Sequence, residues 1–138
     1  MSKPLDAKTP FAPAPETRAR IDDARDRYPT RESALMPCIW AIQDELGHVP
    51  PAAVDFLVEA LGVTRARIHE VLSFYTMFRT EPQADHVLQV CHNISCHIMG
   101  ARPLIAHLEK RLGIRLGETT PDGRFALEGV ECLGACGH

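Results

Sequence analysis

Two pairs of cysteines in the second half of the chain constrain its fold more than any other feature. Four residues separate Cys91 from Cys96, three separate Cys132 from Cys136, and thirty-five lie between the two pairs. Each pair follows a short apolar stretch that has the composition of a β-strand. A fold that brings the ends of these two strands together would therefore gather four thiols in one place.

Four thiolates around one centre suit either a zinc ion or an iron–sulfur cluster. Structural zinc sites mostly use cysteines two residues apart, whereas wider gaps favour a two-iron, two-sulfur cluster in which each pair binds one iron. Gly134 and Gly137 lie beside the second pair and allow backbone N–H groups to approach the sulfurs. Zinc, disulfides and unused thiols stay open as alternatives. Because four cysteines complete the set, we expect no ligand among the nearby histidines, which are His92, His97, His107 and His138.

Composition narrows the classes of protein that the chain can belong to. It has 138 residues, of which 45% are hydrophobic and 24% charged, as in an ordinary soluble globular protein. The net charge of −3 and the lack of a basic patch argue against nucleic acid as a partner. No apolar run is long enough to insert into a membrane, and the N-terminus does not have the pattern of a signal peptide. We therefore expect a cytoplasmic protein, in which clustered cysteines are metal ligands or redox groups before they are disulfides.

Sequence periodicity predicts a helical region before the cysteines. Residues 1–28 are rich in proline and charge, and we expect them to form a flexible tail, of which residues 16–28 are weakly helical with a poor apolar stripe. Residues 29–80 predict a bundle of three short helices, because apolar residues recur there at intervals of three and four. Thr30 is a suitable N-cap for the first helix, and Gly47 and Gly62 are suitable ends for the first and second.

Residues 81–138 predict an α/β unit. Strand, loop, helix, strand, turn and strand are expected in that order, at 86–90, 91–96, 100–112, 114–116, 121–123 and 125–130. The helix is expected to face inward with its apolar residues, which are Leu104, Ile105, Leu108 and Leu112.

Two further features have structural interpretations. Cys38 has no partner nearby in the sequence, and we interpret it as a small buried hydrophobic residue. The aromatic run Ser73–Phe78 could be mistaken for a cofactor-binding segment, and we interpret it as packing or subunit contact.

Five segments in order carry a resemblance to a known family. They are Leu46–Pro50, Ser73–Phe78, Val90–Cys96, Gly117–Gly123 and Glu131–Gly137. Over about residues 28–138 the chain resembles the E subunit of bacterial NADH–quinone oxidoreductase, respiratory complex I. Related thioredoxin-like ferredoxins occur in NAD-reducing hydrogenases and NAD-dependent formate dehydrogenases.

The resemblance implies a small helical N-terminal bundle followed by a thioredoxin-like α/β domain with one two-iron, two-sulfur (2Fe-2S) cluster. By motif match, Cys91 and Cys96 bind one iron, and Cys132 and Cys136 bind the other. Members of this family continue past the second cysteine pair with two strands and a helix, so we expect the domain as given to be incomplete at its C-terminus.

The resemblance also implies a role in a complex. The cluster accepts one electron from the FMN of a flavoprotein subunit, which also binds NADH, and further subunits of the peripheral arm lie at the cytoplasmic face of the membrane. The chain is then part of an enzyme without catalytic residues of its own. The sequence agrees, because it contains no glycine-rich dinucleotide-binding motif.

Three rival functions stay open. The equivalent subunit of a soluble hydrogenase or formate dehydrogenase has the same motifs, and a structural zinc module has the same number of thiols. Residues 54–74 also resemble a helix-turn-helix, with basic residues on the second helix: Arg65, Arg67 and His69. An iron–sulfur regulator that binds DNA is disfavoured because Glu59 and Glu70 flank these residues.

Overall fold

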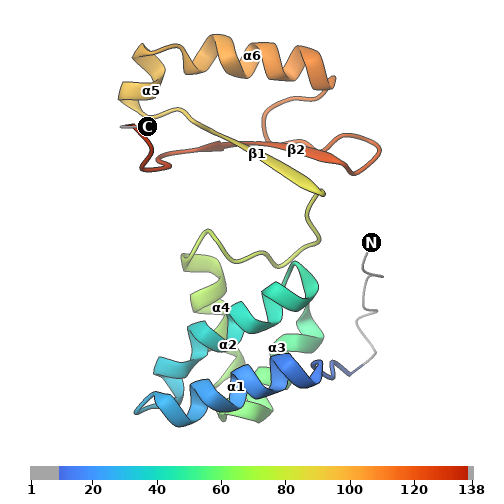
Figure 1. The fold of residues 1–138 in the computed structure, drawn as a ribbon, viewed down its shortest axis with the longest axis vertical. Coiled ribbons are helices and arrows are strands. Elements are labelled where there is room, and N and C mark those ends of the chain that lie inside the picture. The colour runs from blue at the N-terminus through green and yellow to red at the C-terminus, as the bar shows by residue number, and fades with distance from the viewer. Residues whose placement is uncertain (1–9, 137–138) are drawn as a thin grey trace. The chain divides into compact units, whose positions relative to one another are not determined.

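The structure, a computed structural model, describes residues 10–136 (Figure 1). The chain divides into two units, residues 1–82 and 83–138, with the division two residues from the predicted boundary. The first unit is helical and the second contains a parallel β-sheet. Within residues 10–136, no helix combines the length and the apolar character that crossing a membrane requires.

Between residues 10 and 82, the helical unit contains four helices, α1 (Pro15–Arg27), α2 (Arg31–Leu46), α3 (Pro51–Leu61) and α4 (Arg65–Phe74). Two are capped by threonine, since the Thr30 hydroxyl accepts the Ser33 N–H at 3.1 Å and Thr64 caps α4 in the same way. Gly47 and Gly62 end α2 and α3 in left-handed conformations. The three helices predicted between residues 29 and 80 are confirmed, with these caps.

The structure corrects the prediction of a flexible tail over residues 1–28. Pro15–Arg27 form helix α1, which packs against α2, while residues 1–9 lie outside the described part of the chain. The buried residues of α1 are Thr17, Ile21 and Ala24. They share one helix face, but only Ile21 is large and apolar, so the sequence shows a weak apolar stripe.

The core of the helical unit is built mainly from aliphatic side chains of α2, α3 and α4. The largest fully buried side chains of these three helices are those of Leu35, Ile39, Ile42, Leu57 and Ile68. Burying one such side chain is worth about 1.5–3 kcal/mol, so this core supplies the main stabilisation of the unit. Pro37 lies inside α2 without ending it.

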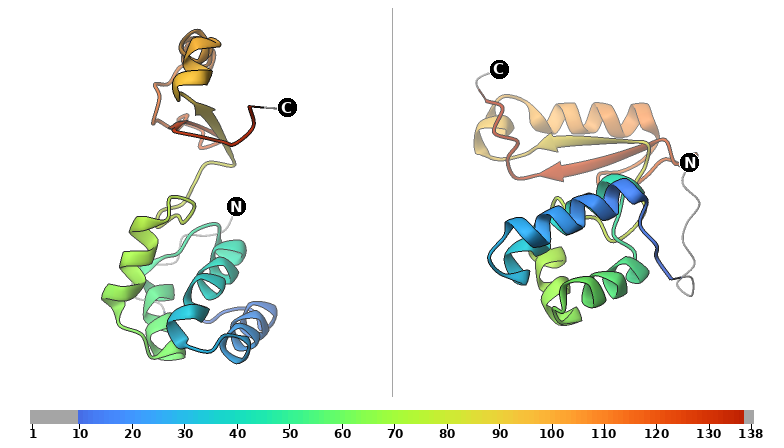
Figure 2. Two further views of the ribbon diagram at one scale, coloured as in Figure 1. Left: turned by 90° about the vertical axis from the view of Figure 1, so that its left-hand side faces the viewer. Right: turned by 60° about the horizontal axis from the view of Figure 1, so that its bottom comes forward.

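The second unit contains β1 (His86–Cys91), α5 (Ile94–Ile98), α6 (Ala101–Leu112) and β2 (Phe125–Val130). The strands pair in parallel from His86 opposite Phe125 to Cys91 opposite Val130, and α6 lies along the sheet (Figures 1 and 2). The core of this unit contains Val90, Ile114 and Leu127, packed against Leu88, Ile105, Leu108 and Leu112. The predicted strand–helix–strand order is confirmed.

Three local predictions in this unit are wrong. The loop expected over 91–96 contains the start of α5, because the Asn93 side chain accepts the Ile94 N–H and caps a short helix. Residues 114–116 form no strand, although Ile114 is buried. Leu104, expected to face inward, is 49% exposed.

Candidate metal centre

The parallel pairing of β1 and β2 brings the cysteine segments to one edge of the sheet. Cys91 is the last residue of β1, and Cys132 lies just beyond Val130, the last residue of β2. Cys96 lies in α5 and Cys136 in the segment that follows β2. Figure 1 shows α5 and this segment at the same end of the unit. The carboxyl ends of parallel strands are where such folds commonly place their sites.

Three of the four cysteines surround a small cavity of about 100 Å³. Its lining consists of Cys91, Cys96, Leu133, Gly134, Ala135 and Cys136. Cys132 is exposed and is not part of this lining. Its Sγ instead accepts a hydrogen bond from the N–H of Gly134 at 3.3 Å, so it belongs to the same loop.

The backbone around the cavity acts on the thiols. The N–H of Asn93 lowers the pKa of the Cys91 thiol, and the thiol of Cys96 and the N–H of Leu133 act in the same direction. The pKa of Cys96 is raised to about 11, because its thiol donates to Cys91 and negative charge on Cys91 and Cys136 disfavours a further thiolate. Cys91 is therefore the thiol of this pair that ionises first.

Sequence reasoning missed the part played by Asn93 and Leu133, whose backbone N–H groups help to lower the pKa of the Cys91 thiol. Asparagine ahead of a short apolar run is a signal for an N-cap, and it could have indicated that the backbone turns there. Peptide N–H groups directed at a sulfur are the contacts that commonly tune a metal-bound thiolate.

The donor set fits an iron–sulfur cluster. Thiolates are the soft ligands that bind zinc or iron–sulfur centres. Throughout residues 10–136, however, no three or more His, Cys, Asp or Glu side chains are grouped so as to hold one metal ion. Three of the cysteines, Cys91, Cys96 and Cys136, nevertheless line one cavity, so the structure places the thiols that such a centre requires beside one another.

Histidines do not line the cavity within the described residues. His92, which directly follows Cys91, lies with its Nε2 3.9 Å from Oε1 of Glu131. Its ring also lies close to Gly129, where an added Cβ would come within 2.9 Å of the His92 Cδ2 atom. His138 lies outside the described residues.

The helix-turn-helix alternative finds no support in the charges of α3 and α4. Arg65 forms an ion pair with Asp55, and Nη1 of Arg67 lies 2.7 Å from Oε2 of Glu70. These acidic partners compete with the phosphates that the arginines would have to bind.

Cys38 is fully buried in α2, and burial raises the pKa of its thiol to about 11. Such a thiol stays protonated near neutral pH and is a poor metal ligand or nucleophile. The interpretation of Cys38 as a small buried hydrophobic residue is confirmed.

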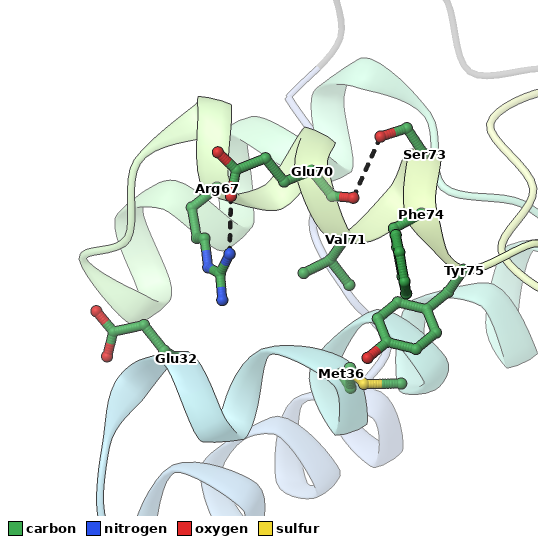
Figure 3. Close-up of a pocket in the computed structure, with 8 residues that line it drawn as sticks. All are labelled: Glu32, Met36, Arg67, Glu70, Val71, Ser73, Phe74 and Tyr75. Carbon is green, nitrogen blue, oxygen red and sulfur yellow. Dashed lines mark hydrogen bonds and ion pairs between the residues drawn. The ribbon is translucent and has the colours of Figure 1, made fainter.

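The aromatic run Ser73–Phe78 divides between core and surface. Phe78 is buried and its ring centroid lies 5.3 Å from that of Trp40, which confirms packing for this residue. Phe74 is 77% exposed, so it does not pack in the core. Figure 3 shows Phe74 and Tyr75 on one wall of a cavity of about 620 Å³, with Glu32 and Met36 of α2 on the other.

Comparison with known proteins gives consistent matches. The model of the thioredoxin-like [2Fe-2S] ferredoxin family matches residues 21–138. An NADH-quinone oxidoreductase E subunit of Rhizobium meliloti, designated E 2, is 50% identical over 119 residues, which are 86% of this chain and 71% of the relative. The corresponding E subunit of Aquifex aeolicus is 36% identical over 129 residues, 94% of this chain and 81% of the relative. That of Mycobacterium tuberculosis is 38% identical over 128 residues, and the match spans 51% of that longer protein.

Proposed function

The chain belongs to the thioredoxin-like [2Fe-2S] ferredoxin family, and on that premise we propose that it is the E subunit of an NADH–quinone oxidoreductase, with a role in electron transfer. The proposal rests on the 50% and 36% identity to relatives of that name, each matched over more than two thirds of its length. The single structural observation that carries it is the set of cysteines at the carboxyl ends of two parallel strands.

Within this proposal, Cys91 and Cys96 hold one iron of a 2Fe-2S cluster and Cys132 and Cys136 hold the other. The cavity that three of these residues line supports the assignment, as do the backbone N–H groups that face Cys91. When bound, a cluster of this type supplies one-electron redox chemistry. The chain itself supplies thiolates, peptide N–H donors and a loop that fixes their spacing.

Three residues of the cysteine loops act on the sulfurs through their backbone N–H groups. The backbone N–H groups of Asn93 and Leu133 lower the pKa of the Cys91 thiol, which favours its ionised, ligating form. Gly134 directs its N–H at the Cys132 sulfur. Hydrogen bonds to thiolates withdraw negative charge, and they are one of the means by which a protein sets the potential of a cluster.

The flavin and the NADH site then belong to a partner flavoprotein subunit, in the peripheral arm at the cytoplasmic face of the membrane. This chain has no glycine-rich dinucleotide motif, which supports an NADH site on the partner subunit and not on this chain. The electron enters from the reduced FMN of the partner, and this chain receives it without a proton donor or nucleophile.

The test compares the chain alone with the chain mixed with its flavoprotein partner, under anaerobic conditions. Alone, the loaded protein should not be reduced by NADH, although dithionite should reduce it. With the partner, NADH should bleach its visible absorption and produce the EPR signal of the reduced state. NADH oxidation by a flavin-free preparation of this chain would contradict the proposal, as would a cluster that the NADH-reduced partner cannot reduce.

A further inference from the structure

The backbone of His92 joins the two segments that carry the cysteines. His92 directly follows Cys91, the last residue of β1. Its N–H donates to the carbonyl oxygen of Val130 at 3.0 Å, which continues the parallel pairing of β1 and β2 past the end of β1. Val130 is the last residue of β2, and Cys132 follows shortly after it. A backbone hydrogen bond therefore connects the segment of the first cysteine pair to that of the second.

The side chain of His92 packs against the same strand. A Cβ added at Gly129 of β2 would come within 2.9 Å of Cδ2 of His92 and within 3.1 Å of a methyl carbon of Leu116. Carbon atoms that are not bonded pack at about 3.5–4.0 Å, so the ring can lie this close only because residue 129 has no side chain. Gly129 has no positive φ, and its backbone conformation does not itself call for glycine. The contact with the His92 ring is therefore what this glycine permits.

The polar contact of His92 is weaker than its packing. The Nε2 atom lies 3.9 Å from Oε1 of Glu131, which is beyond hydrogen-bond distance. The side chain of Glu131 is 82% exposed and that of His92 is 38% exposed, so water screens this pair. The backbone bond and the packed ring are therefore the main contacts that fix His92.

His92 lies between two residues that place the first cysteine pair. Cys91 precedes it, and Asn93 follows it and caps α5, the helix that contains Cys96. The cap is a hydrogen bond of 2.8 Å from the Ile94 N–H to the Asn93 side chain. A displacement of His92 is therefore transmitted along the backbone to both cysteines of this pair.

The thiol of Cys91 provides a further link between the two segments, but it depends on a proton. Its Sγ donates to the carbonyl oxygen of Glu131 at 3.3 Å. A cysteine binds metal as a thiolate and then has no proton to donate. The contacts of His92 do not depend on that proton, so they can hold the two segments together when the cysteines act as ligands.

We propose that His92 is a positioning residue whose imidazole ring, packed on Gly129, sets the spacing between the two cysteine pairs. This inference rests on the proposed function and concerns how the chain holds the cluster. The ring acts through the backbone of Cys91 and Asn93 and binds no iron itself. When the ring is removed, the two loops can move apart more easily. Hydrogen bonds to the sulfurs and their exposure to solvent then change, and both contribute to the potential of a cluster.

The test uses the full chain, loaded with its cluster under anaerobic conditions. His92→Ala should lose the cluster to an iron chelator about five times faster than wild type, and its reduction potential should differ from that of wild type. His92→Phe keeps a flat ring against Gly129 and removes both ring nitrogens. It should retain the wild-type potential and lose the cluster within about twofold of the wild-type rate.

Gly129→Ala tests the same contact from the opposite strand. The added methyl group should displace the ring of His92 and accelerate cluster loss as His92→Ala does. In the His92→Ala background, Gly129→Ala should accelerate the loss by less than about twofold, because the contact that it disrupts is already absent.

His86→Ala is the matched control, because it removes a histidine ring from the other end of β1. This ring lies against Phe125 of β2, with ring centroids 5.3 Å apart, and so also connects the two strands. The control should retain the wild-type potential and lose the cluster within about twofold of the wild-type rate. Thermal unfolding of the cluster-free chain, measured for every variant, separates a loss of fold stability from an effect on the cysteine loops.

Three results would overturn the proposal. The first is a wild-type rate of cluster loss and a wild-type potential in His92→Ala. The second is faster loss in His92→Phe equal to that in His92→Ala, since the ring nitrogens rather than the packed ring would then hold the loops. The third is an equal acceleration in His86→Ala, which would show that any contact between the strands has this effect. A wild-type chain that binds no iron would instead contradict the proposed function itself.

Discussion

Gly134 offers a measurable link between backbone conformation and retention of the cluster. Its φ is 66°, in the left-handed region, and its N–H donates to the Cys132 sulfur. An added Cβ would meet no heavy atom within 4 Å, so Gly134→Ala adds conformational cost without a clash. That cost is about 1–2 kcal/mol. If the bound cluster requires this conformation, the chain should lose its cluster about 5–30 times faster.

The assay follows loss of visible absorption when an iron chelator is added to the anaerobic, oxidised protein. Gly134→Asn should lose the cluster more slowly than Gly134→Ala, because asparagine tolerates left-handed backbone better. The matched control is Gly123→Ala, with a φ of 71° and equally open space, in the turn before β2. It should lower thermal stability by a similar free energy and leave the rate of cluster loss unchanged. Wild-type retention in Gly134→Ala, or equal loss in the control, would refute this reasoning.

Three further predictions concern the helical unit. Ile21→Ala should lower the free energy of unfolding by about 2–5 kcal/mol in urea titrations, whereas Asp26→Ala, exposed on the same helix, should change it by less than about 0.5 kcal/mol. Gln43→Ala removes the hydrogen bonds of the Gln43 side chain to Met77 O (2.9 Å) and Arg79 N–H (2.7 Å), in the segment after α4. It should lower the free energy of unfolding by about 1–3 kcal/mol in the same titrations. An unchanged free energy would show that these two bonds do not stabilise the segment. Because burial raises the pKa of Cys38 from 9.0 to about 11, the unfolded chain loses this proton first, so stability should decline between these pH values. In thermal melts over this pH range, the melting temperature of Cys38→Ala should fall less than that of wild type. An equal fall would contradict the attribution of this pH dependence to the Cys38 thiol.

Features with a strong local signal could be predicted from the sequence. Thr30, Gly47 and Gly62 define helix boundaries through caps that depend on one or two residues. The parallel strands follow from two short apolar runs joined through a helix, a connection that parallel pairing requires. The position of each cysteine pair after a predicted strand suggested that the fold could bring the pairs together, and the structure places Cys91, Cys96 and Cys136 around one cavity, with Cys132 outside its lining.

Features that depend on tertiary contact could not be predicted. Helix α1 is stabilised by burying Thr17, Ile21 and Ala24 against α2, and two of these residues are too small to mark an apolar stripe. Ile114 suggests a strand because it is apolar, yet the backbone bonds to β2 come from residues further along: Gly117 and Glu118 bond the backbone of Leu127, and Thr120 bonds that of Phe125. Leu104 is exposed although it continues the apolar face of α6, because only the later residues of that face pack against the core of the sheet. Sequence periodicity shows which residues share a helix face, but not how far along the helix that face is covered.

The most direct test of the proposed cluster is the metal and sulfide content of the anaerobically purified chain, together with its EPR spectrum. We expect about two irons and two sulfides per chain and a rhombic signal that appears only on reduction. Serine in place of two of the residues Cys91, Cys96, Cys132 and Cys136 should weaken or abolish this signal, whereas Cys38→Ser should leave it unchanged. One zinc per chain with no iron, and no EPR signal after reduction, would contradict the assignment of a 2Fe-2S cluster to these cysteines.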